Sequence, residues 1–324
     1  MNYRAEIDGL RAIAVLSIIF YHAEFIFFGR NWFEGGYIGV DIFFVISGYL
    51  ITRIILSELF TKDSFSILNF YERRVRRILP VLFTVILASF PFAWQRLLPG
   101  DFVEYSQSIL STMFFGSNIF FYFSTIQYGA GNALFKPFLH TWSLGIEEQF
   151  YIVFPILLLF FYKFLRNHIL TIFVAMILVS LQLSGTLSFT NPIFNFYLLI
   201  SRFWELLVGS VLAYYELKYK KIQNSITSQI LPIFGLFLII RSILVSFDSQ
   251  TLHPSFVTLT PLVGVALIIV FSSTKDLVGK VLASKPFVAI GLVSYSAYLW
   301  HFPIFAFSRL ANSFQSNYDK LGWI

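Results

Sequence analysis

Two ionisable residues interrupt the apolar stretch DGLRAIAVLSIIFYH, residues 8–22. Arg11 and His22 are eleven residues apart. In an α-helix this spacing is about 1100° of rotation and about 16 Å of rise, so both side chains project from one face. Such a face suits a long substrate with an anionic head and a reactive far end. The alternative is that Arg11 only orients the helix and His22 only bonds a neighbouring helix, although ionisable residues within a membrane are functional candidates by default.

Four arginines are clustered in the stretch NFYERRVRRILP, residues 69–80. They are Arg73, Arg74, Arg76 and Arg77, and helical spacing brings Arg73 close to both Arg76 and Arg77. The planar guanidinium fork matches phosphate oxygens, so the cluster predicts a site for a multiply phosphorylated ligand. A charge cluster that orients the chain, or a site for anionic lipid headgroups, is the alternative.

A pair of carboxylates follows in FLHTWSLGIEEQFY, residues 138–151. Glu147 and Glu148 are adjacent, so they point in different directions and one of them faces the interior of a helical bundle. A carboxylate beside an imidazole is the usual means of orienting a histidine base. We therefore expect Glu147 or Glu148 to assist His22, unless one is interfacial and the other pairs with an arginine.

The remaining polar residues give weaker signals. Asp41 and His301 are further candidates for the site, and Arg202 with Glu205 is expected to form a self-neutralising structural pair. The five histidines are scattered without metal-ligand spacing, and we expect no metal. The absence of cysteine excludes thiolate ligands and a cysteinyl acyl intermediate.

Composition decides which elements must position these residues. Apolar residues make up 57% and charged residues 12% of the 324, and Phe alone accounts for 41. Soluble domains have about 45–50% apolar and about 25% charged residues. The sequence therefore predicts a polytopic membrane protein in contact with membrane lipids. The net charge of +6 lies in short loops, which favours orientation in the membrane over nucleic-acid binding.

The predicted fold is an all-α transmembrane bundle of about ten helices that forms one domain over residues 1–324. Each apolar segment is close to the length that crosses a bilayer. The segments are 10–28, 38–59, 78–95, 104–123, 143–165, 169–187, 194–215, 228–247, 256–273 and 287–308.

Basic residues predict the orientation of this bundle. The arginine-rich loop after the second segment places the N-terminus in the cytoplasm. If all ten segments cross, however, later basic residues face outward, namely Lys218, Lys220, Lys221, Lys275, Lys280 and Lys285. These loops would face inward if segment 104–123 entered the membrane and returned. We favour ten crossings because of the length of that segment.

Six stretches together resemble the acyltransferase 3 family of bacterial membrane proteins. They are DGLRAIAVLSIIFYH, GGYIGVDIFFVISGYLIT, FYERRVRRILP, HTWSLGIEEQFY, RFWELLVGSVLA and SYSAYLWHFPIF, and they extend from residue 8 to about residue 306. The resemblance implies transfer of an acetyl group from cytoplasmic acetyl-CoA to hydroxyls of a surface polysaccharide, such as lipopolysaccharide, peptidoglycan or exopolysaccharide, or of its lipid-linked precursor. It also implies that Arg11 and His22 match the family's paired essential residues and that the four arginines match its arginine motif.

These inferences lead to one expected function, a multi-pass O-acyltransferase of the bacterial inner membrane. The arginines would hold the coenzyme while His22 acts as a base or takes the acyl group. Family members often continue into a periplasmic SGNH domain, which this sequence does not contain, so final transfer could require a separate periplasmic protein. The alternative is a transporter or flippase for a glycan or lipid, against which the absence of inverted repeats counts.

Overall fold

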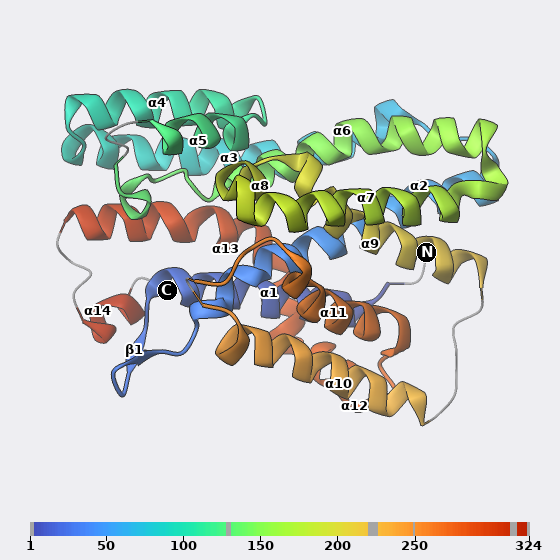
Figure 1. Cartoon of the computed structure of the whole chain (residues 1–324). Helices are drawn as coiled ribbons and strands as arrows, with labels where there is room; N and C mark the ends of the chain where they lie inside the picture. Colours follow the sequence, from blue (N-terminus) through green and yellow to red (C-terminus); the bar gives the residue numbers. More distant parts are fainter. Residues whose placement is uncertain (1–2, 128–130, 220–225, 249, 312–315, 323–324) are drawn as a thin grey trace.

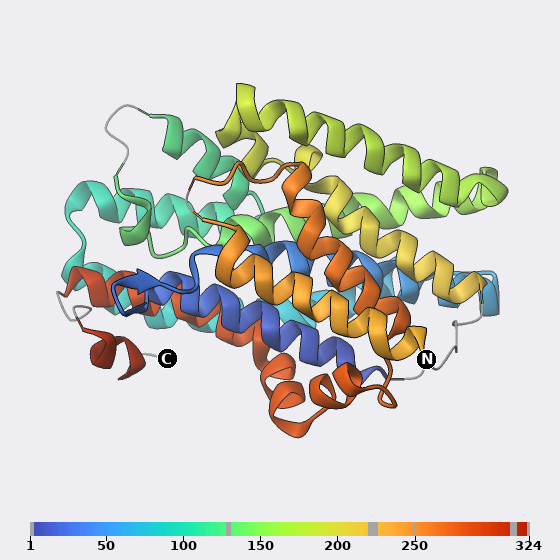
Figure 2. The same ribbon diagram turned by 60° about the horizontal axis from the view of Figure 1, so that its bottom comes forward.

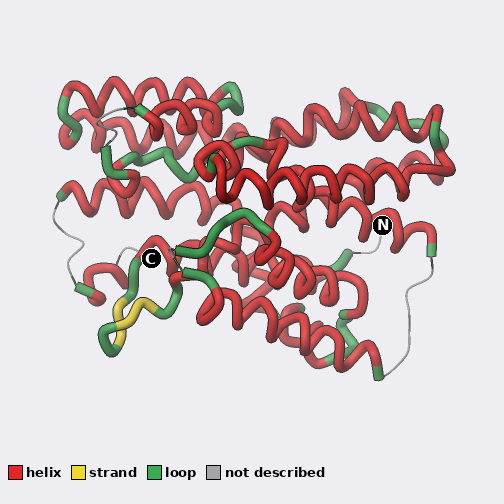
Figure 3. Tube along the Cα trace, viewed as in Figure 1, coloured by secondary structure: helices red, strands yellow, loops and turns green. Residues whose placement is uncertain are grey.

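Apolar stretches fold into helices that run back and forth along one axis (Figures 1 and 3). The computed structural model describes residues 3–127, 131–219, 226–248, 250–311 and 316–322. The longer helices are α1 (Ala5–Ala23), α2 (Gly39–Lys62), α3 (Ile67–Arg96), α4 (Pro99–Met113), α6 (Thr141–Phe164), α7 (Ile169–Thr190), α9 (Leu199–Lys218), α10 (Thr227–Arg241), α11 (Leu259–Phe271) and α13 (Lys285–Leu310).

Shorter elements connect these helices. They are η1 (Glu34–Ile38), α5 (Ser117–Ile126), η2 (Ala133–Phe135), η3 (Arg166–His168), α8 (Pro192–Tyr197), η4 (Ser242–Ser246), η5 (Phe256–Thr258), α12 (Leu277–Leu282), α14 (Asn317–Gly322) and the antiparallel pair β1 (Ile26–Phe27) and β2 (Arg30–Asn31). The prediction of an all-α bundle of about ten helices is confirmed.

The outside of the bundle is apolar, and its apolar core also encloses charged side chains. Within the described residues, six helices are long and apolar enough to cross a membrane. Large apolar side chains such as Leu87, Leu178 and Val179 are exposed, whereas Arg202 and Glu205 are fully buried. In soluble proteins charged side chains are almost never fully buried unless paired, and large exposed apolar surfaces are rare. The fold is therefore that of a multi-pass membrane protein.

The start of α1 defines one end of the bundle, which we call the N-terminal face. Arg4 donates to Glu216 Oε2 on α9 at 3.0 Å and to the carbonyl oxygen of Ile269 on α11 at 2.7 Å. At the other end, which we call the opposite face, Lys320 of α14 donates to the carbonyl oxygen of Glu24 at 2.7 Å. The two chain termini accordingly lie at opposite ends in Figure 1.

The expectation that segment 104–123 crosses as one helix is wrong. The chain breaks after α4, where Phe115 adopts φ 55° and the N–H of Gly116 bonds the carbonyl oxygen of Ser111 at 2.7 Å. α5 then returns toward the opposite face beside α4 (Figure 1). Serines of α4 bond carbonyl oxygens within α4, as Ser108 Oγ does with that of Tyr105 at 2.7 Å. At the start of α5, Ser117 Oγ donates to the Thr141 carbonyl oxygen of α6 at 2.7 Å.

This hairpin changes the number of passes between the two faces. In the part of the chain that the structure describes, the helices that run between the two faces are α1, α2, α3, α6, α7, α9, α10, α11 and α13 (Figure 1). Lys218, Lys275, Lys280 and Lys285 therefore share the N-terminal face with the arginine-rich start of α3. Lys220 and Lys221 lie outside the described residues.

Glycines allow α2 and α9 to pack at very short range. A Cβ atom at Gly48 would lie 1.8 Å from the Leu206 carbonyl oxygen, and one at Gly209 would lie 1.9 Å from that of Val45. Small residues at such crossings are typical of membrane helices. On the other side of α2, α1 packs against both α2 and α13 (Figure 2). α1, α2 and α13 together position Arg11, His22, Asp41 and His301 of the candidate site.

Candidate functional site

A cavity lies among α1, α2, α3, α6 and α13. We call it the arginine cavity. The residues that line it are Arg11, Val40, Phe43, Ile46, Ser47, Leu50, Arg74, Arg77, Ile78, Ser143, Leu144, Glu147, Glu148, Tyr151, Ser294, Tyr295 and Tyr298. It therefore contains three of the five arginines that the sequence predicted for ligand binding.

The helix geometry of α3 divides the arginine cluster into two pairs. Arg74 and Arg77 are three residues apart and line the cavity, with the Arg74 guanidinium 4.7 Å from the centre of the Tyr151 ring. The side chains of Arg73 and Arg76 are 58% and 78% exposed and pair with acidic neighbours outside the cavity. Only Arg74 and Arg77 can reach a ligand there together with Arg11.

The two predicted carboxylates belong to this same cavity. Glu147 accepts hydrogen bonds from Ser47 Oγ and from the Tyr151 hydroxyl, both at 2.8 Å. Glu148 is only 6% exposed and also lines the cavity. The structure thus groups both glutamates with the arginines and does not place either one beside His22.

A second and larger cavity lies toward the opposite face. We call it the histidine cavity. Its lining residues are Ile18, Tyr21, His22, Glu24, Asn31, Glu34, Tyr37, Val40, Ala133, Leu134, Leu139, His140, Trp142, Phe196, Tyr197, Asp248, Thr251, His253, Tyr298 and Phe302. Arg11 and His22, on one helix, thus line two different cavities.

His22 is paired with His301 of α13. His22 Nδ1 and His301 Nε2 are 3.1 Å apart, and His301 Nδ1 is 2.6 Å from the carbonyl oxygen of Tyr298. Because a carbonyl oxygen only accepts, His301 Nδ1 carries the hydrogen and its Nε2 accepts from His22 Nδ1. His22 Nε2 is then left as a basic nitrogen. His301 therefore takes the orienting position that the sequence analysis gave to Glu147 or Glu148.

His140, which precedes α6, is a cavity residue that the sequence analysis did not identify. Its ring is 2% exposed and stacks on Phe302 at 5.4 Å between ring centres. Neither ring nitrogen makes a hydrogen bond to the described residues, although the Leu299 backbone lies beside the ring. The signal in the sequence is its place in the motif HTWSLGIEEQFY.

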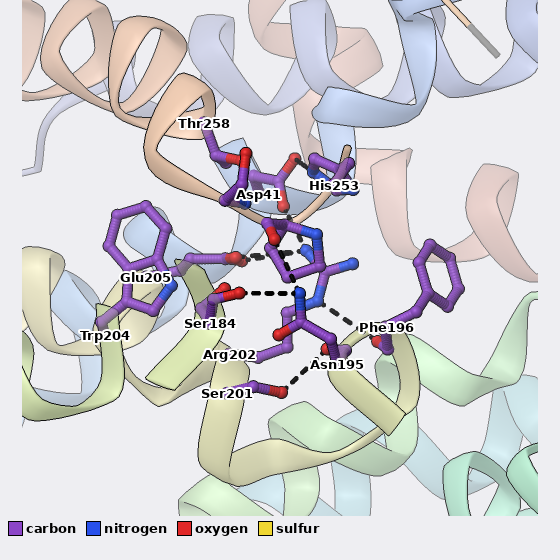
Figure 4. Close-up of polar contacts among 12 residues, drawn as sticks. Asp41, Ser184, Asn195, Phe196, Ser201, Arg202, Trp204, Glu205, His253 and Thr258 are labelled. Atoms are coloured by element: carbon purple, nitrogen blue, oxygen red, sulfur yellow. Dashed lines mark hydrogen bonds and ion pairs between the residues drawn. The ribbon is translucent and has the colours of Figure 1, made fainter. Parts of the chain in front are cut away.

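Asp41 lies behind the histidine cavity in a fully buried ionic network (Figure 4). Arg202 Nη1 donates to Asp41 Oδ1 at 2.7 Å and to Glu205 Oε1 at 3.1 Å. The other oxygen of Asp41 is 2.9 Å from His253 Nε2. The expected Arg202–Glu205 pair is therefore part of a larger network. Asp41 does not line the cavity itself, but it contacts His253, which does. No local sequence motif had indicated His253.

The two cavities share a wall. Val40 and Tyr298 line both of them. The Tyr298 hydroxyl donates to the carbonyl oxygen of His140 at 2.8 Å and lies 2.7 Å from Ser143 Oγ. A cavity lined by arginines and a cavity lined by histidines thus meet at one side-chain layer. This arrangement can hold a charged donor on one side and an acceptor on the other.

Comparison with known proteins agrees with the resemblance. A family model described as "Acyltransferase domain" matches residues 4–323. The O-acetyltransferase OatA of Staphylococcus aureus is 34% identical over 320 residues, which cover 94% of this chain and 51% of that protein. The peptidoglycan O-acetyltransferase OatA of Listeria monocytogenes is 33% identical over 318 residues, with 94% and 49% covered. The chain spans about half the length of these curated relatives. No solved structure matches it.

Proposed function

Because this chain belongs to the acyltransferase 3 family, we propose that it transfers an acetyl group from acetyl-CoA to a hydroxyl of a surface glycan. The observation that carries this proposal is the pair of cavities that meet at Val40 and Tyr298. One cavity offers guanidinium groups for a donor, and the other offers an imidazole for an acceptor. The printed name of the Listeria relative favours peptidoglycan as the glycan.

The arginine cavity suits the donor. Coenzyme A carries several phosphate groups, and guanidinium forks bind phosphate oxygens in bidentate fashion. Arg77 is exposed, while Arg11 and Arg74 are half-buried. The phosphates would contact these arginines, and the pantetheine arm would extend along α1 toward Tyr298. The thioester would then reach the shared wall.

The histidine cavity suits the acceptor and the base. The hydroxyl oxygen attacks the thioester carbonyl carbon while His22 Nε2 takes the hydroxyl proton. An O–C bond forms, the C–S bond breaks, and coenzyme A leaves as a thiolate that takes a proton from Glu147 or Glu148. His301 holds the tautomer of His22 in which Nε2 is the basic nitrogen. General base catalysis of this kind contributes about 10²–10⁴ in rate.

The orientation follows from the same proposal. Acetyl-CoA is made in the cytoplasm, so the N-terminal face would be cytoplasmic and the histidine cavity would open outward. The basic residues gathered on the N-terminal face support this orientation, since cytoplasmic loops are enriched in Lys and Arg. The membrane would be the bacterial inner membrane.

Label transfer tests the proposal. The purified chain in nanodiscs is given acetyl-CoA labelled in the acetyl group together with an oligosaccharide fragment of peptidoglycan. We expect label in the glycan and free coenzyme A in equal amounts, with neither formed by His22→Gln. If the chain instead moved an unmodified glycan across proteoliposomes without consuming acetyl-CoA, it would be a transporter and the proposal would fail.

A further inference from the structure

A groove lies between the second half of α3 and the second half of α13, near the opposite face. We call it the α3–α13 groove. On the α3 side its wall is formed by Val85, Ala88, Phe92 and Arg96. These residues are three or four positions apart, so they form one stripe along the helix. The groove is not enclosed by protein, since Phe92 in its wall is 56% exposed.

The two helices run side by side in the same direction. In the first half of each, the Tyr295 hydroxyl donates to the carbonyl oxygen of Ile78 at 3.2 Å. In the second half, the ring centres of Phe92 and Phe307 are 5.9 Å apart. α13 therefore presents a stripe of its own to the stripe on α3, and both helices end at the same side of the molecule (Figure 1).

The groove has the length of one lipid chain. From Val85 to Arg96 the helix rises about 16 Å, at 1.5 Å per residue. The hydrocarbon core of a bilayer is about 30 Å thick, so the chains of one leaflet span about 15 Å. An acyl chain of the leaflet at the opposite face therefore matches the groove from end to end.

The lining of the groove is apolar along this length. Its two serines use their hydroxyl hydrogens within the protein, where Ser89 Oγ donates to the Ile86 carbonyl oxygen at 2.8 Å and Ser308 Oγ to that of Ile304 at 2.7 Å. The other lining residues before Arg96 are hydrophobic. A hydrocarbon chain can therefore fill the groove without leaving a polar group of the wall unpaired.

Arg96 supplies a positive charge at the outer end of the groove. It is the last residue of α3, it is exposed, and it makes no ion pair with the residues that the structure describes. Trp94, two residues before it, is 70% exposed. Exposed tryptophans mark the headgroup level of a membrane, and arginine at that level attracts anionic headgroups. The charge thus lies where the phosphate of a lipid in the groove would be.

We propose that the α3–α13 groove binds one anionic phospholipid of the leaflet at the opposite face. One acyl chain lies between the two helices, and the phosphate contacts Arg96. This site is separate from the two cavities and does not depend on the proposed reaction. Trp300 and Pro303 in its wall are close neighbours of His301, so the lipid packs against the stretch of α13 that carries the partner of His22.

The alternative role of Arg96 is local. A cation at the C-terminal end of a helix interacts favourably with the last carbonyl groups, and this role needs no lipid. Arg241 provides the comparison, because it is likewise the exposed last residue of a helix that ends at the opposite face, α10, and does not line the groove. A lipid site requires a difference between these two arginines.

Native mass spectrometry of the purified chain measures the affinity for added lipid. Phosphatidylglycerol and phosphatidylcholine with identical acyl chains are the probes, so that only the headgroup differs. Arg96→Gln removes the charge, and Arg241→Gln is its matched control. Ala88→Phe fills the middle of the groove, and Leu87→Phe is its control, because Leu87 is 72% exposed on the same helix and does not line the groove.

The two changes should affect binding differently. We expect wild type to bind phosphatidylglycerol more tightly than phosphatidylcholine. Arg96→Gln should reduce this preference about fivefold, because one arginine near a membrane surface contributes about 1 kcal/mol to the binding of an anionic lipid. Ala88→Phe should weaken the binding of both lipids and keep the preference, since the chain loses its place and the headgroup does not. Both controls should bind as wild type does.

Tryptophan fluorescence locates the bound chain. Phosphatidylglycerol that carries bromine on its acyl chains quenches nearby tryptophans, and Trp300 lines the groove. We expect Trp300→Phe to remove a saturable part of the quenching that wild type shows, although five other tryptophans remain of the six in the chain. If Ala88→Phe does not fold, this measurement decides whether the chain occupies the groove.

Four outcomes overturn the inference. They are equal affinity of wild type for the two lipids, an equal loss of preference in Arg241→Gln, wild-type binding by Ala88→Phe, and unchanged quenching in Trp300→Phe. Displacement of phosphatidylglycerol by an equal amount of a polyprenyl phosphate would also overturn it, because the groove would then bind a prenyl carrier rather than a phospholipid.

Discussion

Alanine substitution of Arg74 should weaken acetyl-CoA binding far more than the same substitution of its neighbour Arg73. Arg74 lines the arginine cavity, whereas the side chain of Arg73 is 58% exposed and faces Glu58 outside it. A charge-assisted hydrogen bond contributes about 1.5–3 kcal/mol, so Arg74→Ala should lose roughly ten- to a hundred-fold in affinity. Arg77→Ala should lose less, about two- to tenfold, because its exposed position lets solvent screen the contact.

Isothermal titration of acetyl-CoA into purified variants measures these differences. Arg73→Ala and Arg76→Ala are the matched controls, with the same change in charge at the same helix, and both should bind as wild type. Arg74→Lys should recover only part of the loss, because lysine lacks the planar fork and its ammonium contacts the Tyr151 ring differently. If all four alanine variants lose affinity equally, or if Arg74→Lys is fully active, the cluster acts only through its net charge.

Three further outcomes follow from the geometry. His22→Gln should bind acetyl-CoA normally yet transfer no acetyl group, and substantial turnover by this variant would rule out His22 as the base. His301→Gln should have a milder defect, because its amide can still accept a hydrogen bond from His22 Nδ1. His140→Phe should raise the free energy of unfolding by about 1–3 kcal/mol, because it removes an unpaired buried imidazole beside Phe302. Thermal unfolding measures this, and a loss of stability would mean that the imidazole has a polar partner. In intact spheroplasts an impermeant thiol reagent should label Asp248→Cys but label Lys280→Cys only after lysis. Labelling of Lys280→Cys without lysis, with Asp248→Cys protected, would restore the tenth crossing.

Helical periodicity predicted that Arg11 and His22 share one side of their helix. It could not predict which residues of other helices lie beside them. The eleven-residue spacing correctly placed Arg11 and His22 on one side of α1. It could not show that a wall divides them, because Val40 and Tyr298 come from other helices. His301, the partner of His22, is 279 residues away in the sequence. The adjacent positions of Glu147 and Glu148 in their motif could not show that neither of them lies beside His22.

The same limit explains the miscounted crossing and the missed histidines. Segment 104–123 has the length of a membrane helix, but its break depends on the backbone of Phe115 and on the bonds that α6 offers to Ser117. His253 lies in a loop with no motif. Its contact with Asp41, 212 residues away in the sequence, is visible only in the folded chain. By contrast, the all-α class and the family followed from composition and from motifs that are local in sequence.

The wall at Tyr298 also has an electrical consequence. In the proposed reaction, acetyl transfer releases a proton from the acceptor hydroxyl in the histidine cavity and consumes one at the thiolate in the arginine cavity. If that proton does not return through the wall, each turnover moves one positive charge outward, which a membrane potential of 100 mV opposes by about 2.3 kcal/mol. The Tyr298 hydroxyl, bonded to the His140 carbonyl oxygen and beside Ser143, is the polar group in the wall through which a proton could return. If a proton can cross this layer, the reaction is electrically neutral. If it cannot, the membrane potential slows the reaction.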